Sequence, residues 1–399
     1  MEYSIVRILF LSFYFRPDLS AGSFRAAMLA DALLDALPPG SVIDVLTTLP
    51  NRYGSFATEA LATETIGNLR ITRIALPPHK NGMRDQSRAF LSYAREALKH
   101  TAEKNYDLVF ATSSRLMTAS LGAWFARRKR VPLYLDIRDI FVDTMKDILP
   151  RPVALSARPV LSILERLTVR QASRTNLVSA GFQEYFASRY PDMPLSFFTN
   201  GIDDEFLNLK PVEKTECADS SVVEILYAGN LGDGQGMDVI LPKLALRLAD
   251  RARFRVIGDG GRRRALVQAL EESGVNNVEL LPLVSRKDLV AAYQRCDVLF
   301  LHLNTHEAFK KVLPSKIFEY GASGKPILAG IDGYAASFVR SELSNAAVFP
   351  PSDAEAGEHA FGSLSLCWSD RSAFIRQYSR KKIMQEMAQD VIGVVNAEA

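Results

Sequence analysis

Short apolar runs alternate with amphipathic helical stretches along almost the whole chain. The stretches between the runs, such as 25–37, repeat apolar residues at helical spacing. This alternation is typical of parallel βαβ units, so the pattern predicts an α/β fold. The first series of predicted strands is 8–13, 42–46, 69–74, 108–111, 133–136, 177–179 and 195–199. The second series is 223–228, 254–257, 278–281, 298–301, 327–329 and 347–349.

Two series of this kind predict two doubly wound domains, because 399 residues exceed what one typical core supports. The polar stretch 210–221 between them has the composition of a linker. Ligands bind at the carboxyl ends of the strands in such sheets, so we expect the domains to face each other across a central cleft. The predicted organisation is a domain 1–205, a linker 206–222, a domain 223–370, and a helical segment 371–399 that packs back on the first domain.

The composition is that of an ordinary globular protein, with 48% hydrophobic and 23% charged residues, which argues against disorder. No run of about 18 apolar residues lacks a charge, so no transmembrane helix is predicted. Cys217, Cys296 and Cys367 lie far apart and form no CxxC pair, which fits a reducing cytosol. The five histidines have no metal-ligand spacing, and we predict no metal.

The charge is uneven along the chain. Residues 1–200 carry 25 lysines and arginines against 18 carboxylates, whereas residues 201–399 carry 23 against 27. A basic first half suits anionic lipid head groups or a diphosphate-bearing acceptor, and by itself would also suit nucleic acid. Such a bias often serves solubility alone.

The densest chemical signal is the segment 313–326, LPSKIFEYGASGKP. Pro314 and Ser315 predict a helix start, where unpaired N–H groups favour a diphosphate. Lys316 would add a charge-assisted contact, and Glu319, on the same helix face, could accept hydrogen bonds from ribose hydroxyls. The alternative interpretation is an ordinary surface ion pair between Lys316 and Glu319.

Two glycine-containing turns follow predicted strands. The first, 227–236, contains Gly229, Asn230, Gly232 and Gln235, and its glycines would let the backbone approach a phosphate. The second, 256–261, carries Gly258 and Gly260 at the carboxyl edge of the next strand. Taken alone, either could be a simple tight turn.

Three charged residues also end a strand in the first half: Asp136, Arg138 and Asp139. Charges at such a position need either a partner or a function. A structural Asp–Arg salt bridge is the alternative to a ligand contact.

Together these motifs resemble family 4 retaining glycosyltransferases, which have the GT-B architecture. The resemblance covers nearly the whole chain, including Asn200-Gly201-Ile202-Asp203, which we expect to be architectural. The family pattern Glu-x7-Glu matches at Glu319, but Lys311 occupies the first glutamate position. Asn230 and Gln235 replace the usual Arg and Lys, so we expect Lys316 or the cluster 262–264 to meet the phosphate charge. These departures resemble a sub-branch that transfers amino sugars or deoxy sugars for O-antigen and other surface polysaccharides.

The resemblance implies a function and a set of roles. It implies metal-independent, retaining transfer of a hexosyl or N-acetylhexosaminyl group, with Pro314, Ser315, Lys316 and Glu319 holding a UDP-sugar donor. It places Arg138 and Asp139 at the transferred sugar, and Gly22 in the loop that touches donor phosphate and acceptor. No cofactor is implied. Retention without a placed nucleophile suggests front-face substitution, in which the leaving phosphate oxygen takes the proton of the acceptor hydroxyl.

A lipid-linked saccharide is the expected acceptor, with the protein in the cytoplasm at the inner face of the membrane and without nucleic acid. The basic amphipathic segment 152–174 could lie on that membrane or pack on the sheet. Two other functions stay open. One is a nucleotide-sugar 2-epimerase, and the other is a non-catalytic sugar-nucleotide-binding partner of another transferase.

Overall fold

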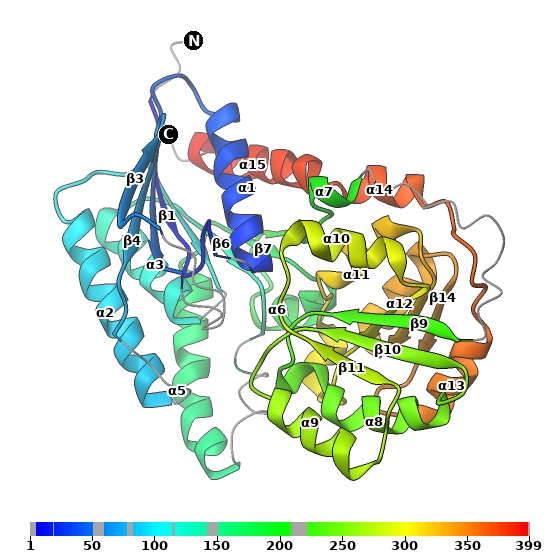
Figure 1. Cartoon of the computed structure of the whole chain (residues 1–399). Coiled ribbons are helices and arrows are strands. Elements are labelled where there is room, and N and C mark those ends of the chain that lie inside the picture. Colours follow the sequence, from blue (N-terminus) through cyan, green and yellow to red (C-terminus); the bar gives the residue numbers. More distant parts are fainter. Residues whose placement is uncertain are drawn as a thin grey trace. The chain divides into compact units, whose positions relative to one another are not determined.

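The computed structural model of the chain divides into two compact units, each built on its own parallel sheet (Figure 1). The first unit comprises Met1–Asn200 with Arg380–Ala399, and the second comprises Gly201–Ser379. The predicted fold class, α/β with two Rossmann-like domains, is confirmed. The structure describes residues 5–18, 20–50, 60–77, 83–113, 116–140, 142, 151–207, 209 and 222–397.

An eight-stranded sheet forms the centre of the first unit, in the order β3-β4-β2-β1-β5-β6-β7-β8. Neighbouring strands are parallel except β3, which pairs antiparallel with β4 at the edge. The order reverses between β1 and β5, which is where ligands bind in doubly wound sheets. The strands are β1 (Arg7–Leu11), β2 (Val42–Thr48), β3 (Thr63–Ile66), β4 (Leu69–Ile74), β5 (Leu108–Thr112), β6 (Leu133–Ile137), β7 (Arg174–Leu177) and β8 (Leu195–Ser196).

The helices of the first unit include the C-terminal one, which packs along the first helix of the chain (Figure 1). The C-terminal helix α15 thus belongs to the first unit. The helices are α1 (Ala21–Ala36), α2 (Met83–Thr101), α3 (Leu116–Lys129), α5 (Arg151–Arg170), the 3-10 turn η1 (Ala180–Phe182), α6 (Gln183–Arg189) and α15 (Arg380–Ala397).

A buried ion pair joins these elements. The guanidinium of Arg25, on α1, donates to both carboxylate oxygens of Asp136, at 3.0 and 2.9 Å. It also donates to the carbonyls of Phe198 and Thr199 and contacts the sulfur of Met387 on α15. Both charged side chains are almost wholly buried. One side chain therefore connects α1, β6, the segment after β8, and α15.

The second unit has a six-stranded, wholly parallel sheet in the order β11-β10-β9-β12-β13-β14. This is the classic dinucleotide-fold order, and its reversal lies between β9 and β12. The strands are β9 (Val223–Ala228), β10 (Ala252–Ile257), β11 (Val278–Leu281), β12 (Val298–His302), β13 (Ile327–Gly330) and β14 (Ala346–Phe349).

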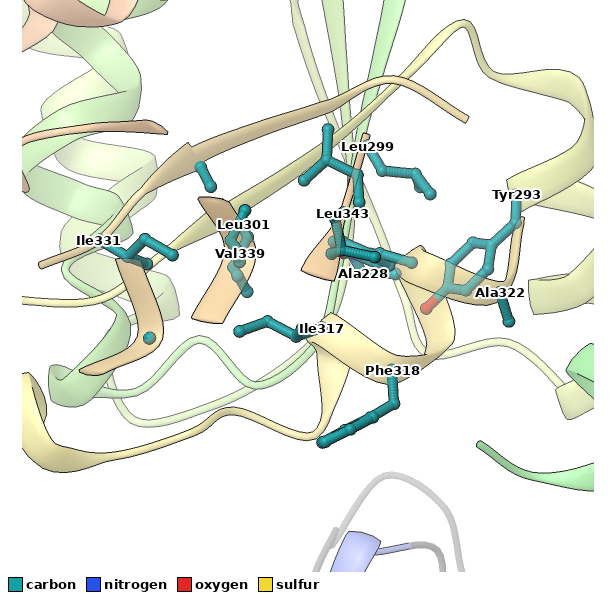
Figure 2. Close-up of a cluster of buried hydrophobic side chains, with 14 of the residues drawn as sticks. Ala228, Tyr293, Leu299, Leu301, Ile317, Phe318, Ala322, Ile331, Val339 and Leu343 are labelled. Carbon is teal, nitrogen blue, oxygen red and sulfur yellow. The ribbon is translucent and has the colours of Figure 1, made fainter. Parts of the chain in front are cut away.

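Two apolar clusters form the core of the second unit, and the strands contribute to both by alternation. On β12, Leu299 and Leu301 belong to one cluster, whereas Val298 and Phe300 belong to the other. Figure 2 shows the first cluster, in which Ile317 lies among the strand side chains. The helices are α7 (Asp204–Leu207), η2 (Asp233–Gln235), α8 (Met237–Arg247), α9 (Arg263–Glu272), α10 (Arg286–Arg295), η3 (Glu307–Lys311), α11 (Lys316–Ser323), α12 (Gly333–Glu342), α13 (Ala354–Gly362) and α14 (Ser372–Tyr378).

The predicted strands agree with the observed ones except in the first sheet, where β3 and β7 differ and the predicted strand 195–199 is only Leu195–Ser196. β3 was not predicted, because its four residues are mostly exposed and form no apolar run. β7 lies at Arg174–Leu177 rather than 177–179, because its buried residues Thr175 and Asn176 are polar. The Asn176 amide is satisfied by Asp136 and the Phe198 carbonyl, and the hydrophobic pattern does not reveal this.

The two points at which the chain passes from one unit to the other differ from the predicted boundaries. The chain changes unit after Asn200 rather than at 205, and Phe206 is buried in the second unit with its ring 5.5 Å from that of Tyr293. The polar stretch 210–221 lies outside the described residues. At the other end α14 remains in the second unit, where Phe374 is buried, and the return begins at Arg380 rather than 371.

Removal of the Asp136 charge tests the role of the buried pair. In Asp136→Asn the Arg25 guanidinium stays buried without a counter-ion, and we expect the first unit to lose about 3–5 kcal/mol of unfolding free energy. The partly exposed pair Arg16–Asp31, with side chains 33% and 46% exposed, is a control, since Asp31→Asn should cost less than about 1 kcal/mol.

Urea unfolding can be monitored by the fluorescence of Trp124 in a Trp368→Phe background. Because the chain has only these two tryptophans, the signal then reports on the first unit. Equal losses in the two variants would contradict the central role of Arg25.

Candidate functional site

The glycine turn 229–236 lies where the second sheet reverses its strand order. It leaves the carboxyl end of β9, and β12, the adjacent strand across the reversal, ends at His302. The His302 Nδ1 lies 2.6 Å from the Gln235 carbonyl oxygen, which ties the two strand ends together. The predicted donor turn therefore occupies the position at which doubly wound sheets bind ligands.

The polar side chains of this turn are engaged with the turn itself. The Asn230 amide donates to the Gln235 side-chain oxygen at 3.1 Å, and the Gly232 N–H donates to the same oxygen at 3.2 Å. The Tyr227 hydroxyl donates to the Asn230 carbonyl at 2.6 Å. Asn230 and Gln235 thus fix the shape of the turn and add no positive charge to it.

The second glycine turn supports the first by backbone contact. The N–H of Gly229 donates to the Ile257 carbonyl, and the N–H of Leu231 donates to the Asp259 carbonyl. A Cβ at Gly258 would lie 2.1 Å from the Gly229 carbonyl oxygen, and one at Gly260 would lie 2.5 Å from that of Leu231. Both glycines are required for close packing of the two turns.

The predicted helix start at Pro314–Ser315 is present. α11 begins at Lys316 with Ser315 as its N-cap residue, although the Ser315 hydroxyl does not cap the helix. A Cβ on Gly229 would lie 3.5 Å from Cε of Lys316, so the lysine side chain runs beside the glycine turn. The helix start, its lysine and the turn are therefore brought together. The other predicted source of cations, the cluster 262–264, has its Arg262 guanidinium paired with Asp238.

Glu319 is buried in a network of polar side chains. Its Oε2 accepts hydrogen bonds from Lys316 Nζ and from the Tyr293 hydroxyl, each at 2.9 Å. Its Oε1 lies 3.9 Å from the Arg286 guanidinium. Burial raises the pKa of Glu319, but attraction to Lys316 and Arg286 outweighs it and holds the pKa below its usual range. The predicted ion pair with Lys316 exists, and it belongs to a buried network rather than to the surface.

Arg286 is the residue of this network that the sequence did not reveal. It begins α10, contacts Asp203 and Glu319, and lies over the Phe206 ring at 4.8 Å. Its partners are 83 and 33 positions away in the chain, and no local motif marks it. Burial lowers its pKa, but the surrounding carboxylates raise it overall, so it stays cationic.

His302 is a fully buried residue at the end of β12. Its Nε2 lies 2.9 Å from the Ser352 N–H, and Nδ1 faces the Gln235 carbonyl. The Ser352 contact requires Nε2 to accept, so the proton resides on Nδ1. Burial lowers the pKa of His302 to about 4, against the opposing effect of the Gln235 hydrogen bond. The neutral ring therefore anchors the glycine turn at ordinary pH.

In the first unit, the structure brings together Arg138 and Gly22. A Cβ on Gly22 would lie 3.6 Å from the Arg138 guanidinium, which also lies 3.5 Å from the Asn200 side-chain oxygen. Burial lowers the pKa of Arg138 to about 10, with the nearby Asp136 and Asp139 opposing that shift, so the side chain stays cationic. Asp139 is exposed.

The alternative interpretation, a structural salt bridge, is shown for Asp136. Asp136 is in a salt bridge, but with Arg25 rather than with its neighbour Arg138. Its burial therefore has a structural reason. Arg138 and Asp139 remain the candidates for ligand contact in the first unit.

Family models match both halves of the chain. Residues 25–201 match the model described as glycosyl transferase 4-like domain, and residues 217–382 match glycosyl transferases group 1. A protein of Escherichia coli K12 named as a colanic acid biosynthesis glycosyl transferase, WcaI, is 32% identical over 111 residues. That match covers 28% of this chain and 27% of WcaI, so the chain spans about a quarter of its curated relative.

Solved structures share the fold along the whole chain. Sucrose-phosphate synthase from Thermosynechococcus elongatus has a TM-score of 0.71 at 14% identity, covering 98% of this chain and 97% of that one. Anabaena Alr3699/HepE in complex with UDP and glucose has a TM-score of 0.65 at 16% identity, covering 97% and 99%. At such identities the similarity concerns the fold.

The buried His302 predicts a pH-dependent stability. Its folded pKa of about 4 lies below the unfolded value of about 6.5, so the unfolded chain binds more protons between these values. The contribution of neutral His302 to the free energy of unfolding is complete above pH 6.5 and declines as the pH falls. The decline is about 2 kcal/mol between pH 8 and pH 5.

We expect His302→Gln to lose that part of the pH dependence in urea unfolding. His306→Gln is the control, because about a third of the His306 side chain is exposed and it should keep the wild-type decline. Identical pH profiles for wild type and His302→Gln would refute the assignment of a buried neutral ring.

Proposed function

We propose that this chain, which belongs to the glycosyltransferases by the family models matched along both halves, transfers a sugar from a UDP-linked donor with retention of configuration. One observation carries the proposal. The glycine turn after β9, the start of α11 with Lys316, and the carboxylate of Glu319 lie together at the strand-order reversal of the second sheet. These are the groups that a nucleoside diphosphate needs.

Each part of the donor has a partner of suitable chemistry. Lys316 and the N–H groups at the start of α11 would bind the diphosphate, for which Lys316 exchanges its present bond to Glu319. Among the residues that the structure describes, the one ion-pair contact of Glu319 Oε1 is with Arg286 at 3.9 Å, so this oxygen keeps capacity to accept from ribose hydroxyls. The turn around Gly229 and Gly232 would admit the diphosphate close to the backbone. Pro314 and Ser315 set where the helix begins.

The first unit would provide the acceptor side. In our proposal Arg138 and Asp139 contact the transferred sugar, and Gly22 leaves room for close approach. Transfer is metal-independent and proceeds by front-face substitution, in which the leaving phosphate oxygen takes the acceptor proton while the protein stabilises the diphosphate charge. The sugar is a hexosyl or N-acetylhexosaminyl group for a surface polysaccharide. The acceptor is a lipid-linked saccharide, which brings the enzyme to the cytoplasmic face of a membrane.

One observation favours a second function. Asn230 and Gln235 are neutral and bonded to each other, and Lys311 stands at the position of a family glutamate. A chain that binds UDP without turning over a donor would be a non-catalytic partner of another transferase.

Binding and turnover distinguish the two. Loss of a charge-assisted bond weakens UDP binding by roughly 10- to 100-fold, so we expect this rise in Kd for Lys316→Met and Glu319→Gln in calorimetry. Lys99→Met is the matched control, because Lys99 forms the same i,i+3 pair with Glu96 on α2. UDP release from a panel of UDP-sugars, with and without a lipid extract, should require lipid and fall in both site variants.

The outcomes separate the functions. Unchanged UDP affinity in both site variants would refute the donor site itself. Normal UDP binding without consumption of any donor would favour the non-catalytic partner.

A further inference from the structure

An exposed apolar stripe runs along α5 in the first unit. Val160, Ile163 and Leu167 are 66%, 60% and 64% exposed, and their i, i+3, i+7 spacing puts them on one face of the helix. Large apolar side chains gathered in this way mark an interaction surface more often than scattered ones do.

The opposite face of α5 is fixed to the unit. Glu165 is buried and accepts a hydrogen bond from the Tyr185 hydroxyl at 2.8 Å, and Val169 is buried beside it. Thr168 is hydrogen-bonded to Ser120 on α3 at 2.8 Å. Because these residues hold the inner face, the stripe points outward as a property of the first unit alone.

α3 continues the surface on the other side of the Ser120–Thr168 contact. Met117 and Trp124 are 38% and 43% exposed and lie two turns apart on one face. At 100° per residue, Ser120 lies on the same side of α3 as Met117 and Trp124. Because Ser120 is hydrogen-bonded to Thr168, these two exposed side chains form a second apolar stripe that adjoins α5. The Arg128 guanidinium lies 5.3 Å from the Trp124 ring.

The exposed charged residues on α3 and on the described part of α5 are all basic. Arg127 and Arg128 on α3, and Arg166 and Arg170 on α5, are exposed. By helical geometry Arg166 and Arg170 flank the apolar stripe on the outward side. The only carboxylate in the sequence of either helix is Glu165, which is buried. The surface is therefore apolar and cationic.

We infer that this surface of α3 and α5 docks on an anionic lipid bilayer. Apolar side chains that enter the interface, a tryptophan, and arginines at head-group level are the combination that peripheral helices use. A second copy of the chain is a poor occupant, because a symmetric contact would place arginines against arginines. The inference rests on the proposed function only in that a lipid-linked acceptor gives the docking a purpose.

Vesicle binding tests the inference on the full chain. We expect it to sediment with phosphatidylglycerol vesicles but not with phosphatidylcholine vesicles, and to be released by salt. Val160→Ser/Ile163→Ser/Leu167→Ser and, separately, Arg166→Gln/Arg170→Gln should each lower the partition coefficient by roughly tenfold or more. Val239→Ser/Leu246→Ser is the matched control, since these residues are exposed on α8 of the second unit.

Measurements of UDP affinity and thermal unfolding separate a failure of membrane docking from a failure of the proposed donor site. All variants should keep wild-type UDP affinity and thermal unfolding, so loss of UDP binding would report on the proposed function and not on docking. Equal binding to both lipids, or unchanged binding of both surface variants, would overturn the inference. The inference would also be overturned if sedimentation velocity showed a lipid-free dimer that dissociates in the Val160→Ser/Ile163→Ser/Leu167→Ser variant.

Discussion

The buried pair of Arg25 and Asp136 is the interaction on which the first unit depends. Two charges can leave water only when nearly every donor and acceptor finds a partner, and here the guanidinium meets a carboxylate and two carbonyl groups. Asp136 takes a further bond from Asn176. Because Asp136 lies two residues before Arg138, and Arg25 lies three after Gly22, the pair also fixes the candidate acceptor-side residues. The positions of Gly22 and Arg138 are thus consequences of a structural ion pair beneath them.

Glu319 has a comparable role in the second unit, with one difference. Its carboxylate is held by Lys316, Tyr293 and Arg286, but the lysine runs along the glycine turn and is partly exposed. A phosphate can therefore take Lys316 while Tyr293 and Arg286 continue to satisfy the carboxylate. One member of the network, Lys316, is thus partly accessible to a ligand.

The sequence predicted most of the fold because the two sheets are built from apolar strands of sufficient length. It also placed the turns at Gly229 and Gly258 and the helix start at Lys316 correctly, since strand ends and helix caps are local features. It did not predict β3, which is short and exposed, or the position of β7, whose Asn176 is buried by hydrogen bonding. Arg25 and Arg286 escaped notice because their partners are distant in the chain. The 205 boundary was placed too late because Phe206 packs on Tyr293, a contact that composition cannot reveal.

The charge balance of the donor side explains why the replacements at Asn230 and Gln235 matter. Lys316 and Arg286 carry two positive charges, and Glu319, Asp203 and Glu205 carry three negative ones, so these five side chains have a formal net charge of −1. A diphosphate bound there, as we propose, would gain no positive charge from Asn230 and Gln235, because these two are bonded to each other as neutral amides. Under the proposed function its attraction would then come from Lys316 and from the positive end of the α11 dipole, whose direction is fixed. A site of this kind would select its ligand by the position of the phosphates more than by their total charge, and the two tightly packed turns would provide that position.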